Sequence, residues 1–232
     1  MADSDSRPRV ICHMMTSVDG RIVVDGWPIS PEERRHYEQV HASYDADGWI
    51  CGRVTMEPFA GGLRSDAEVA REHPGGGARD DFRAPGEFDS FVFAVDASGR
   101  LAWESGDIEG DHVVAILTER VSDEYLAFLR ERGVSYLLAG AAEVDLPLAL
   151  RKIASGFGVQ TLMLEGGGRI NGGMLRAGLI DEVSLLLAPV VDGRMGTPAL
   201  FDDDEDCTPY RLSLEGVEQR EGGFLWLRYR VS

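Results

Sequence analysis

Four consecutive residues, Glu165-Gly166-Gly167-Gly168, have the composition of a turn that could bind an anion. They follow the apolar run 161–164, which predicts a buried strand, and they precede apolar residues at helical spacing. A strand, a glycine turn and a helix start gather free backbone N–H groups at the positive end of the helix dipole. This suits a pyrophosphate, although the spacing does not match the G-x-G-x-x-G dinucleotide fingerprint. An ordinary strand-to-helix turn explains the same residues, so this stretch alone leaves both interpretations open.

A second glycine turn, Gly52-Arg-Val-Thr55, follows the short apolar run 49–51. The guanidinium of Arg53 and the hydroxyl of Thr55 are both groups that donate hydrogen bonds to phosphate oxygens. Two such turns in one chain predict a long ligand that carries more than one phosphate.

The overall charge limits the partners of the protein. The 232-residue chain has a formal net charge of −17, and both nucleic acid and an anionic membrane surface need a basic face for binding. We therefore expect no nucleic-acid or membrane partner, and an anionic ligand must be held by local arginines and backbone N–H groups. The apolar fraction of 44% predicts a full hydrophobic core, and the length fits a single domain over residues 1–232.

Cysteine spacing and hydropathy give no sign of export or of a metal. Cys12, Cys51 and Cys207 show no C-x-x-C pattern, so neither a disulfide framework nor a metal site is predicted. The first residues lack an apolar signal-peptide core, and no run approaches the roughly 18 apolar residues of a membrane helix. These features predict a soluble, cytoplasmic protein.

The elements that would position the two turns alternate along the chain. Extended segments are predicted at residues 10–15, 21–24, 49–51, 91–95, 113–117, 134–138, 161–164, 182–189, 210–217 and 224–231. Helices are predicted from Ser30 to about 43, with a Ser30/Glu33 capping box, then over 122–132 and 145–155, with a further helical turn from 56 and a helix ending near 178. This order is typical of an α/β fold with a mostly parallel sheet and a C-terminal antiparallel hairpin. Residues 61–88 are predicted to form a long surface loop, and the acidic run 202–206 a solvated loop.

Five segments resemble one known family in both content and order. They are Thr16-Ser-Val-Asp-Gly-Arg-Ile22, Asp45-Ala-Asp-Gly-Trp-Ile-Cys-Gly52, Leu164-Glu-Gly-Gly-Gly168, Leu175-Arg-Ala-Gly-Leu-Ile-Asp-Glu-Val-Ser-Leu185 and Ala188-Pro189. The chain is similar to the dihydrofolate-reductase-like superfamily, and most closely to the reductase domain of the bacterial riboflavin-biosynthesis deaminase/reductase and its stand-alone relatives. The resemblance implies an NADPH-dependent reductase without metal or flavin, usually a homodimer, with helices flanking the central sheet.

The resemblance also implies roles for particular residues. The turn with Gly52, Arg53 and Thr55 resembles the superfamily's contact to the adenosine side of NADPH. Thr118 and Arg120 resemble residues that select the 2′-phosphate. Cofactor-binding positions are further implied at Gly140, Gly166, Gly167 and Gly168, with the glycine pair 166–167 against the pyrophosphate, and at Ser17, Asp19 and Gly20 around the nicotinamide.

Two residues are implied to be catalytic. Glu165 matches an acidic residue at the junction of substrate and cofactor, and His13 occupies the place of a substrate-binding lysine. A histidine on a strand is more often a satisfied core residue, but this position favours a functional role. We expect the two side chains to face each other, so that the pKa of His13 is raised and its charge replaces that of the lysine.

The substrate motif departs from the family pattern. The arginine that follows the family's first helix falls near Val40-His41, and the family's Asp-x-Pro…Arg segment is not recognisable in Met56-Glu-Pro-Phe-Ala60. In the family these groups hold the substrate's ribose phosphate. The resemblance therefore implies a 5-amino-6-(5-phosphoribosylamino)uracil reductase-like enzyme, which reduces a diaminopyrimidine or aminouracil ribose 5-phosphate. A reductase of a pterin-like or other small heterocycle and a non-catalytic NADPH-binding homologue remain open as alternatives.

Overall fold

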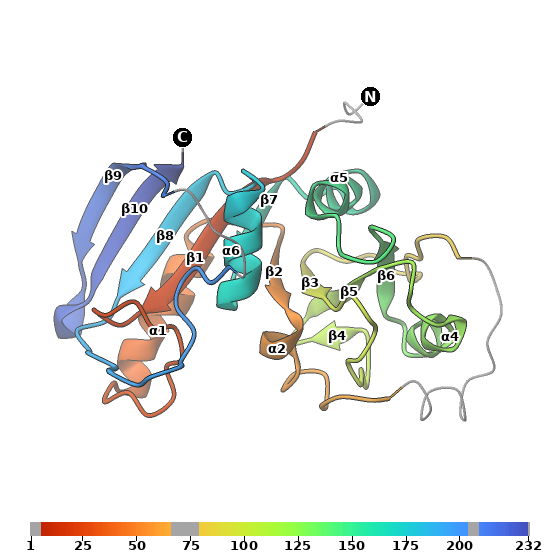
Figure 1. Ribbon diagram of the computed structural model, residues 1–232, viewed down its shortest axis with the longest axis horizontal. Coiled ribbons are helices and arrows are strands. Elements are labelled where there is room, and N and C mark those ends of the chain that lie inside the picture. Colours follow the sequence, from red (N-terminus) through yellow and green to blue (C-terminus); the bar gives the residue numbers. More distant parts are fainter. Residues whose placement is uncertain (1–5, 66–78, 204–208, 232) are drawn as a thin grey trace. The chain divides into compact units, whose positions relative to one another are not determined.

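The computed structural model describes residues 6–65, 79–203 and 209–231 (Figure 1). The described residues divide into two compact units. The central unit comprises those of Met1–Pro8 and Asp47–Gln160, and the terminal unit those of Arg9–Ala46 and Thr161–Ser232. The prediction of one domain over 1–232 stays a prediction.

The central unit is built from parallel strands joined by helices. Its elements are β2 (Gly48–Gly52), α2 (Arg53–Met56), β3 (Phe91–Val95), β4 (Asp107–Ile108), β5 (Asp111–Leu117), α4 (Asp123–Glu131), β6 (Ser135–Leu138) and α5 (Leu146–Phe157). β2, β3, β5 and β6 pair in that order and are parallel, while the short β4 runs antiparallel to the start of β5. The carboxyl ends of β2, β3, β5 and β6 therefore lie at one edge of this sheet.

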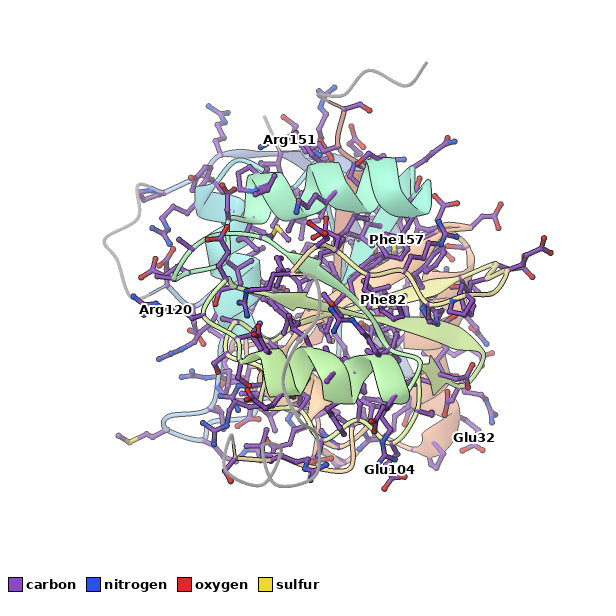
Figure 2. The ribbon with its side chains drawn as sticks, turned by 90° about the vertical axis from the view of Figure 1, so that its right-hand side faces the viewer. Glu32, Phe82, Glu104, Arg120, Arg151 and Phe157 are labelled. Carbon is purple, nitrogen blue, oxygen red and sulfur yellow. The ribbon has the colours of Figure 1, made fainter. Side chains whose placement is uncertain are left out.

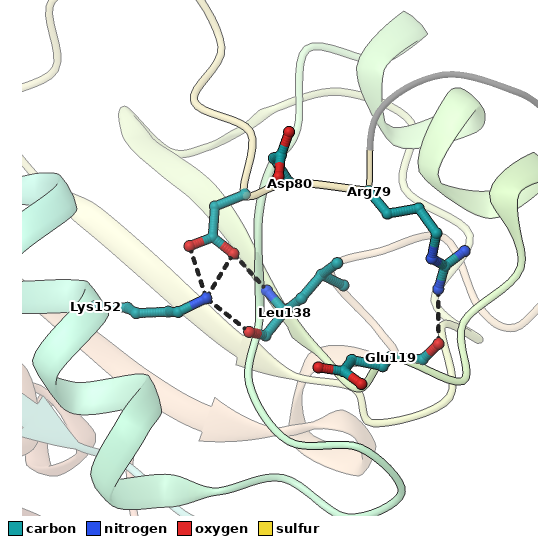
Figure 3. A pocket seen from close by; sticks show the side chains of 6 residues that line it. Arg79, Asp80, Glu119, Leu138 and Lys152 are labelled. Atoms are coloured by element: carbon teal, nitrogen blue, oxygen red, sulfur yellow. Dashed lines mark hydrogen bonds and ion pairs between the residues drawn. The ribbon is translucent and has the colours of Figure 1, made fainter.

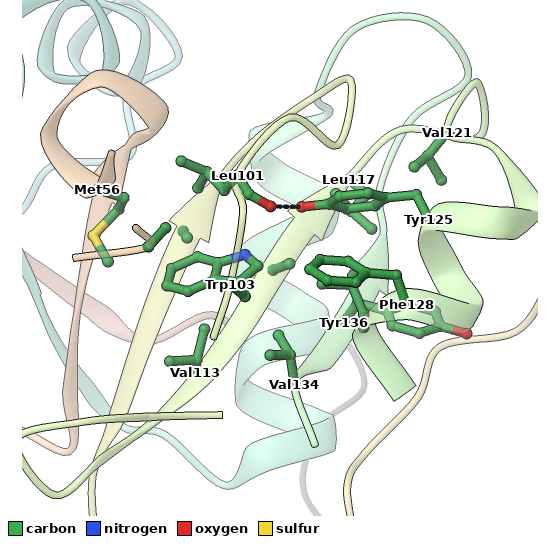
Figure 4. Packing of buried hydrophobic residues seen from close by; sticks show 14 of the residues in the cluster. Met56, Leu101, Trp103, Val113, Leu117, Val121, Tyr125, Phe128, Val134 and Tyr136 are labelled. Atoms are coloured by element: carbon green, nitrogen blue, oxygen red, sulfur yellow. Dashed lines mark hydrogen bonds between the residues drawn. The ribbon is translucent and has the colours of Figure 1, made fainter. Parts of the chain in front are cut away.

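Helices cover both faces of the central strands. Figure 4 shows the core on one face, where Tyr125 and Phe128 of α4 pack with Trp103 among fully buried side chains. The hydroxyl of Tyr125 donates a hydrogen bond of 2.8 Å to the carbonyl of Leu101, which satisfies the one polar atom of that ring. On the other face, Phe157 of α5 packs edge-on against aromatic side chains of β3. Figure 2 shows α4 and α5 on opposite sides of these strands.

The terminal unit combines parallel and antiparallel strands. Its elements are β1 (Arg9–Thr16), α1 (Pro31–Ala42), β7 (Thr161–Leu164), α6 (Gly168–Arg176), β8 (Glu182–Leu187), β9 (Leu212–Gln219), a 3-10 turn (Glu221–Gly223) and β10 (Leu225–Val231). β1 lies between β7 and β8 and is parallel to both, and β10 joins β8 to β9 with antiparallel pairing. The predicted α/β class, with a mostly parallel sheet and a C-terminal hairpin, is confirmed.

Local sequence signals account for the helix starts. The Ser30 side chain accepts the N–H of Glu33 while the Glu33 carboxylate accepts the N–H of Ser30, so the predicted capping box is present. Ser122 and Asp145 cap α4 and α5 in the same way as N-cap acceptors. These caps set where the three helices begin and therefore where their side chains point.

The structure differs from the predictions at several places, of which four concern the position or existence of an element. Residues 21–24 form no strand, and only an isolated bridge joins Arg21 to Ala199. α2 begins at Arg53, directly after β2, instead of at residue 56. β4 was not predicted, because two residues give too short a pattern. β8 ends at Leu187, two residues before the predicted end.

Some predicted features fall partly or wholly outside the described residues. Cys207 does, as do residues 66–78 of the predicted loop and 204–206 of the acidic run. The described part of the loop, residues 61–65 and 79–88, contains no helix or strand, and isolated bridges hold it at Leu63 and Phe82. Within the described ranges, no helix is both long and apolar enough to cross a membrane.

Candidate functional site

The glycine turn of the terminal unit leads from β7 into α6. Gly166 has a φ of +89°, a left-handed conformation that favours glycine, and a Cβ there would meet the side chain of Met14 at 2.9 Å. The peptide bond between Gly166 and Gly167 is cis. Gly167 is the N-cap of α6 and, being a glycine, supplies no side-chain acceptor for the first turn. The start of α6 therefore presents backbone N–H groups without the usual capping side chain, as an anion site requires.

Gly168 has a packing role in the same turn. A Cβ on this residue would collide with the carbonyl oxygen of Ala199 and with the carboxylate of Asp202. The N–H of Asp202 also donates to the carbonyl of Gly168. The backbone of residues 199–202 thus lies directly against the helix start, and this contact explains the third glycine without a ligand.

Glu165, the first residue after β7, is paired with a histidine that the prediction did not include. Its Oε1 lies 2.7 Å from Nδ1 of His41, and only 13% of the Glu165 side chain is exposed. His41 lies in the last turn of α1, 124 residues away in the sequence. The resemblance to the family did contain a signal for His41. The family's arginine falls near Val40-His41, so a cation could have been expected at this position.

His13 does not occupy the place predicted for it. It lies within β1, not at its end, and is completely buried. Its Nδ1 lies 3.1 Å from the hydroxyl of Ser184 and its Nε2 lies 3.1 Å from the carbonyl of Tyr37. Burial lowers the pKa of His13, and this effect outweighs the opposing charge of Glu165. The prediction that His13 is a cationic anchor with a raised pKa was wrong, because it neglected desolvation.

The loop after β1 is organised by a carboxylate. Asp19 accepts hydrogen bonds from the hydroxyl of Ser17 at 2.7 Å and from the backbone N–H groups of Asp192 and Gly193 at 2.8 and 3.0 Å. The N–H of Gly193, then the other donors, lower the pKa of Asp19 to about 2. Gly20 has a φ of +80° and turns the chain beside them. Ser17, Asp19 and Gly20 therefore form one structural unit, and their predicted nicotinamide contact stays a prediction.

The glycine turn of the central unit contains Gly52, Arg53 and Thr55. Gly52 is the N-cap of α2, and Arg53 is the first residue of this single helical turn. The carboxylate of Asp96, at the end of β3, is fully buried, and burial raises its pKa against the hydrogen bonds of the 100–101 backbone and the charge of Arg53. Arg53 thus lies close enough to Asp96 for its charge to act on that carboxylate.

Thr118 and Arg120 both line one pocket of the central unit. Its volume is about 220 Å³, and the residues around it are Ala97, Ser98, Thr118, Arg120, Ser122 and Ala142. Thr118 is buried and its hydroxyl donates to the carbonyl of Ala97 at 2.7 Å, whereas Arg120 is exposed at the edge of the unit (Figure 2). The pocket lies after the carboxyl ends of β3 and β5, as the prediction of a phosphate-binding position requires.

Gly140 follows the end of β6 and its conformation has a local cause. Its φ is +98°, and a Cβ there would collide with the carbonyl oxygen of Glu143. Its own carbonyl accepts the N–H of Glu119. Gly140 therefore shapes the loop that borders the pocket, and its predicted contact with the cofactor stays a prediction.

A larger pocket in the central unit contains none of the predicted site residues. Its volume is about 610 Å³, and Figure 3 shows its charged lining of Arg79, Asp80, Asp81, Glu119 and Lys152, with Leu138. Lys152 pairs with Asp81 at 2.9 Å, and Arg79 donates to the carbonyl of Glu119 at 2.6 Å. The two cations are thus already engaged within the protein. Among the described residues, no three His, Cys, Asp or Glu side chains are grouped to hold a metal ion.

The predicted residues thus fall into two sets, each inside one unit. The terminal unit brings Glu165 together with Gly166, Gly167 and Gly168, and places His41 on Glu165. The central unit brings Thr118 and Arg120 into one pocket. His13 is close enough to Glu165 to sense its charge, but its ring is engaged elsewhere.

Comparisons with known proteins identify the family of the chain. The family model described as the RibD C-terminal domain matches residues 8–226. Two curated relatives are both named 2,5-diamino-6-ribosylamino-4(3H)-pyrimidinone 5′-phosphate reductase. The one from Methanothermobacter thermautotrophicus is 38% identical over 102 residues, and the one from Aquifex aeolicus is 34% identical over 83 residues. The matches cover 43% and 36% of this chain and span only 46% and 37% of those relatives.

Solved structures extend the similarity to nearly the whole chain. A pyrimidine reductase-like protein from Corynebacterium diphtheriae has a TM-score of 0.70 at 18% identity, covering 97% of this chain and 92% of that chain. RibD from Acinetobacter baumannii has a TM-score of 0.65 at 20% identity, covering 97% and 58%. At such identities the likeness shows the fold, and the family follows from the match over residues 8–226. The chain therefore belongs to the RibD C-terminal domain family, a reductase family of riboflavin biosynthesis with a dihydrofolate-reductase-like fold.

Proposed function

We propose that the protein is an NADPH-dependent reductase of the riboflavin-biosynthesis type, acting on a ribosylamino-pyrimidine 5′-phosphate. The observation that carries the proposal is the glycine turn at the start of α6, which has no capping side chain and directly follows Glu165. The names of the two curated relatives support the substrate class.

The residues present fit NADPH in their chemistry. The exposed guanidinium of Arg120, with the hydroxyls of Ser98 and Ser122 in the same pocket, is a donor set suited to the 2′-phosphate. The N–H groups at the start of α6 suit the pyrophosphate, since no side chain of the N-cap residue accepts from them and the positive end of a helix dipole lies behind them. Against a net charge of −17, such local donors are what an anionic cofactor needs.

The reaction would reduce a C=N bond. The ribosylamino group opens to an imine, its C1′ gains a hydride and its nitrogen a proton, and the product is the ribitylamino compound. NADPH, when bound, supplies the hydride. The protein's part is alignment and electrostatics: Glu165, held by His41, would meet the substrate beside the glycine turn.

One observation is also compatible with other substrates. Both ring nitrogens of His13 are engaged inside the protein, so this residue offers no cation to a ribose phosphate. A reductase of a pterin-like or other small heterocycle would not need that cation, and neither would a non-catalytic NADPH-binding homologue.

We also propose that the protein is a homodimer that uses the C-terminal hairpin. Leu214 and Val217 on β9 are 58% and 59% exposed, and they pair across the strands with Tyr229 and Leu227 of β10. An apolar sheet surface on an outer strand is commonly covered by a partner. A second copy of the chain would cover it by a self-complementary contact.

The test of the function is NADPH oxidation over a panel of ribosylamino-pyrimidine phosphates, their dephosphorylated forms and dihydropterins. The proposal expects turnover of a phosphorylated pyrimidine with NADPH, and Glu165→Gln should depress kcat far more than cofactor affinity. Turnover of only a pterin would favour the alternative reductase. NADPH binding without turnover of any compound would favour the non-catalytic homologue.

A further inference from the structure

We propose that His41 is a positioning residue, which holds the carboxylate of Glu165 in place at the start of the glycine turn and supplies the charge that balances it. The contact is direct, with 2.7 Å between Nδ1 of His41 and Oε1 of Glu165. The Glu165 side chain is 13% exposed and that of His41 is 33% exposed. The pair is thus sheltered, yet the imidazole remains in exchange with solvent.

The surroundings of Glu165 call for a compensating cation. Burial, and then the charge of Glu165, raise the pKa of the Cys12 thiol, so Cys12 stays neutral. Burial lowers the pKa of His13, so His13 is neutral as well. Cys12 and His13 on β1 and His41 on α1 are the titratable groups that these contacts bring to Glu165. Of these three, His41 is the one placed to carry a positive charge. A carboxylate that is mostly buried is costly without such a partner.

The helix supports the same charge state. His41 lies in the last turn of α1, which runs from Pro31 to Ala42, where the negative end of the helix dipole favours a cation. Nδ1 faces the carboxylate, so it must carry a hydrogen in both the neutral and the protonated imidazole. Protonation at Nε2 then converts a hydrogen bond into an ion pair without moving the ring.

Contacts of Tyr37, one helical turn before His41, fix the direction in which the His41 side chain points. The hydroxyl of Tyr37 donates to the carbonyl of His13 at 3.1 Å, and the two rings stack with centroids 4.2 Å apart. Residues i and i+4 of a helix lie on one face, so this attachment to β1 places His41 over the end of the neighbouring β7. The Ser43 hydroxyl then closes the helix by donating to the carbonyl of Val40.

The first test needs no substrate. The five histidines of the protein can be followed by NMR titration of the imidazole signals, and the His41 signal is the one lost in His41→Gln. In Glu165→Gln, the protonation midpoint of His41 should move to lower pH, because the opposite charge at 2.7 Å is gone. His36→Gln, on the same helix, is the matched control and should leave the His41 midpoint unchanged. An equal His41 midpoint in the wild type and in Glu165→Gln would overturn the inference.

The second test separates positioning from structural support, and it rests on the proposed function. On a substrate that the wild type reduces, His41→Gln should lower kcat about tenfold with little change in NADPH affinity. The wild-type kcat should fall as pH rises and His41 loses its proton. His41→Arg keeps the charge without titrating, so it should restore kcat and show no such fall. An unchanged kcat in His41→Gln would refute the positioning role. If the wild type reduces nothing on the panel, the proposed function fails, and the titration still decides whether His41 holds Glu165.

Discussion

The ring of His13 stacks on the ring of Tyr37, with centroids 4.2 Å apart and planes 21° from parallel. This contact joins β1 to α1, and a hydrogen bond between His13 Nε2 and the carbonyl of Tyr37 joins the same two elements inside the protein. His13 is therefore part of the scaffold that carries His41 and Glu165.

Replacing His13 should cost stability in a pH-dependent way. His13→Phe keeps a stacked ring but leaves buried partners unsatisfied, so at pH 7.5 the free energy of unfolding should fall by about 1–3 kcal/mol. Folding favours the neutral imidazole, because the pKa of His13 is lowered in the folded state. The wild type therefore loses this contribution as pH falls below about 6.5, towards the lowered pKa.

Urea unfolding followed by circular dichroism between pH 5 and 7.5 checks this prediction. The difference between wild type and His13→Phe should shrink as pH falls. The pKa of His112 is also lowered by burial, but His112 is present in both proteins and cancels. A difference that grows towards acid pH would mean that His13 is protonated in the folded protein.

Arg120→Ala should weaken NADPH binding about 10- to 100-fold and leave NADH binding unchanged, since a hydrogen bond to a charged group contributes about 1.5–3 kcal/mol. Isothermal titration calorimetry with both cofactors measures this. Arg151→Ala on α5 is the control, because Arg151 does not line the 220 Å³ pocket. Equal losses for NADPH and NADH, or none, would place the 2′-phosphate elsewhere.

The glycines of the turn should respond differently to substitution. Gly167 has a φ of −72°, which any residue adopts, so Gly167→Val should remain folded by circular dichroism while losing NADPH binding through its added bulk. Gly168→Val should lose stability even without cofactor, because its Cβ would collide with Ala199. Normal NADPH binding by Gly167→Val would show that the pyrophosphate does not approach this turn.

The dimer proposal predicts a mass twice that of the chain by light scattering at micromolar concentration. The double variant Leu214→Glu/Val217→Glu should be a folded monomer, because it places four like charges on a self-complementary apolar contact. Glu215→Gln, on the same strand, serves as a control. A monomeric wild type would refute the proposal.

What the sequence predicted well depends on short-range signals. The start of α1 is encoded within four residues by Ser30 and Glu33, and the structure contains that capping box. The strands of the central unit are runs of buried apolar residues, so their existence and parallel order could be predicted. The glycine turn after β7 could also be predicted, because its residues are consecutive in the sequence.

What the sequence did not predict depends on contacts between distant residues. Glu165 and His41 are 124 residues apart, and only the packing of α1 on β1 determines that they meet. The carboxylate of Asp19 accepts hydrogen bonds from the backbone at 192–193, a partner that no local pattern reveals. The burial of His13 likewise follows from the whole sheet and its covering helix, not from the residues beside it.

The proposed reaction is the transfer of a hydride from NADPH to a ribosylamino-pyrimidine. The most direct measurement is mass spectrometry and NMR of the product formed from 2,5-diamino-6-ribosylamino-4(3H)-pyrimidinone 5′-phosphate with NADPH deuterated at the nicotinamide C4, on the face that is transferred. We expect the wild type to form a ribitylamino product with deuterium at C1′, and Glu165→Gln to form much less of it. A substrate recovered unchanged with either C4-deuterated epimer of NADPH, or a product with deuterium at any other carbon, would contradict it.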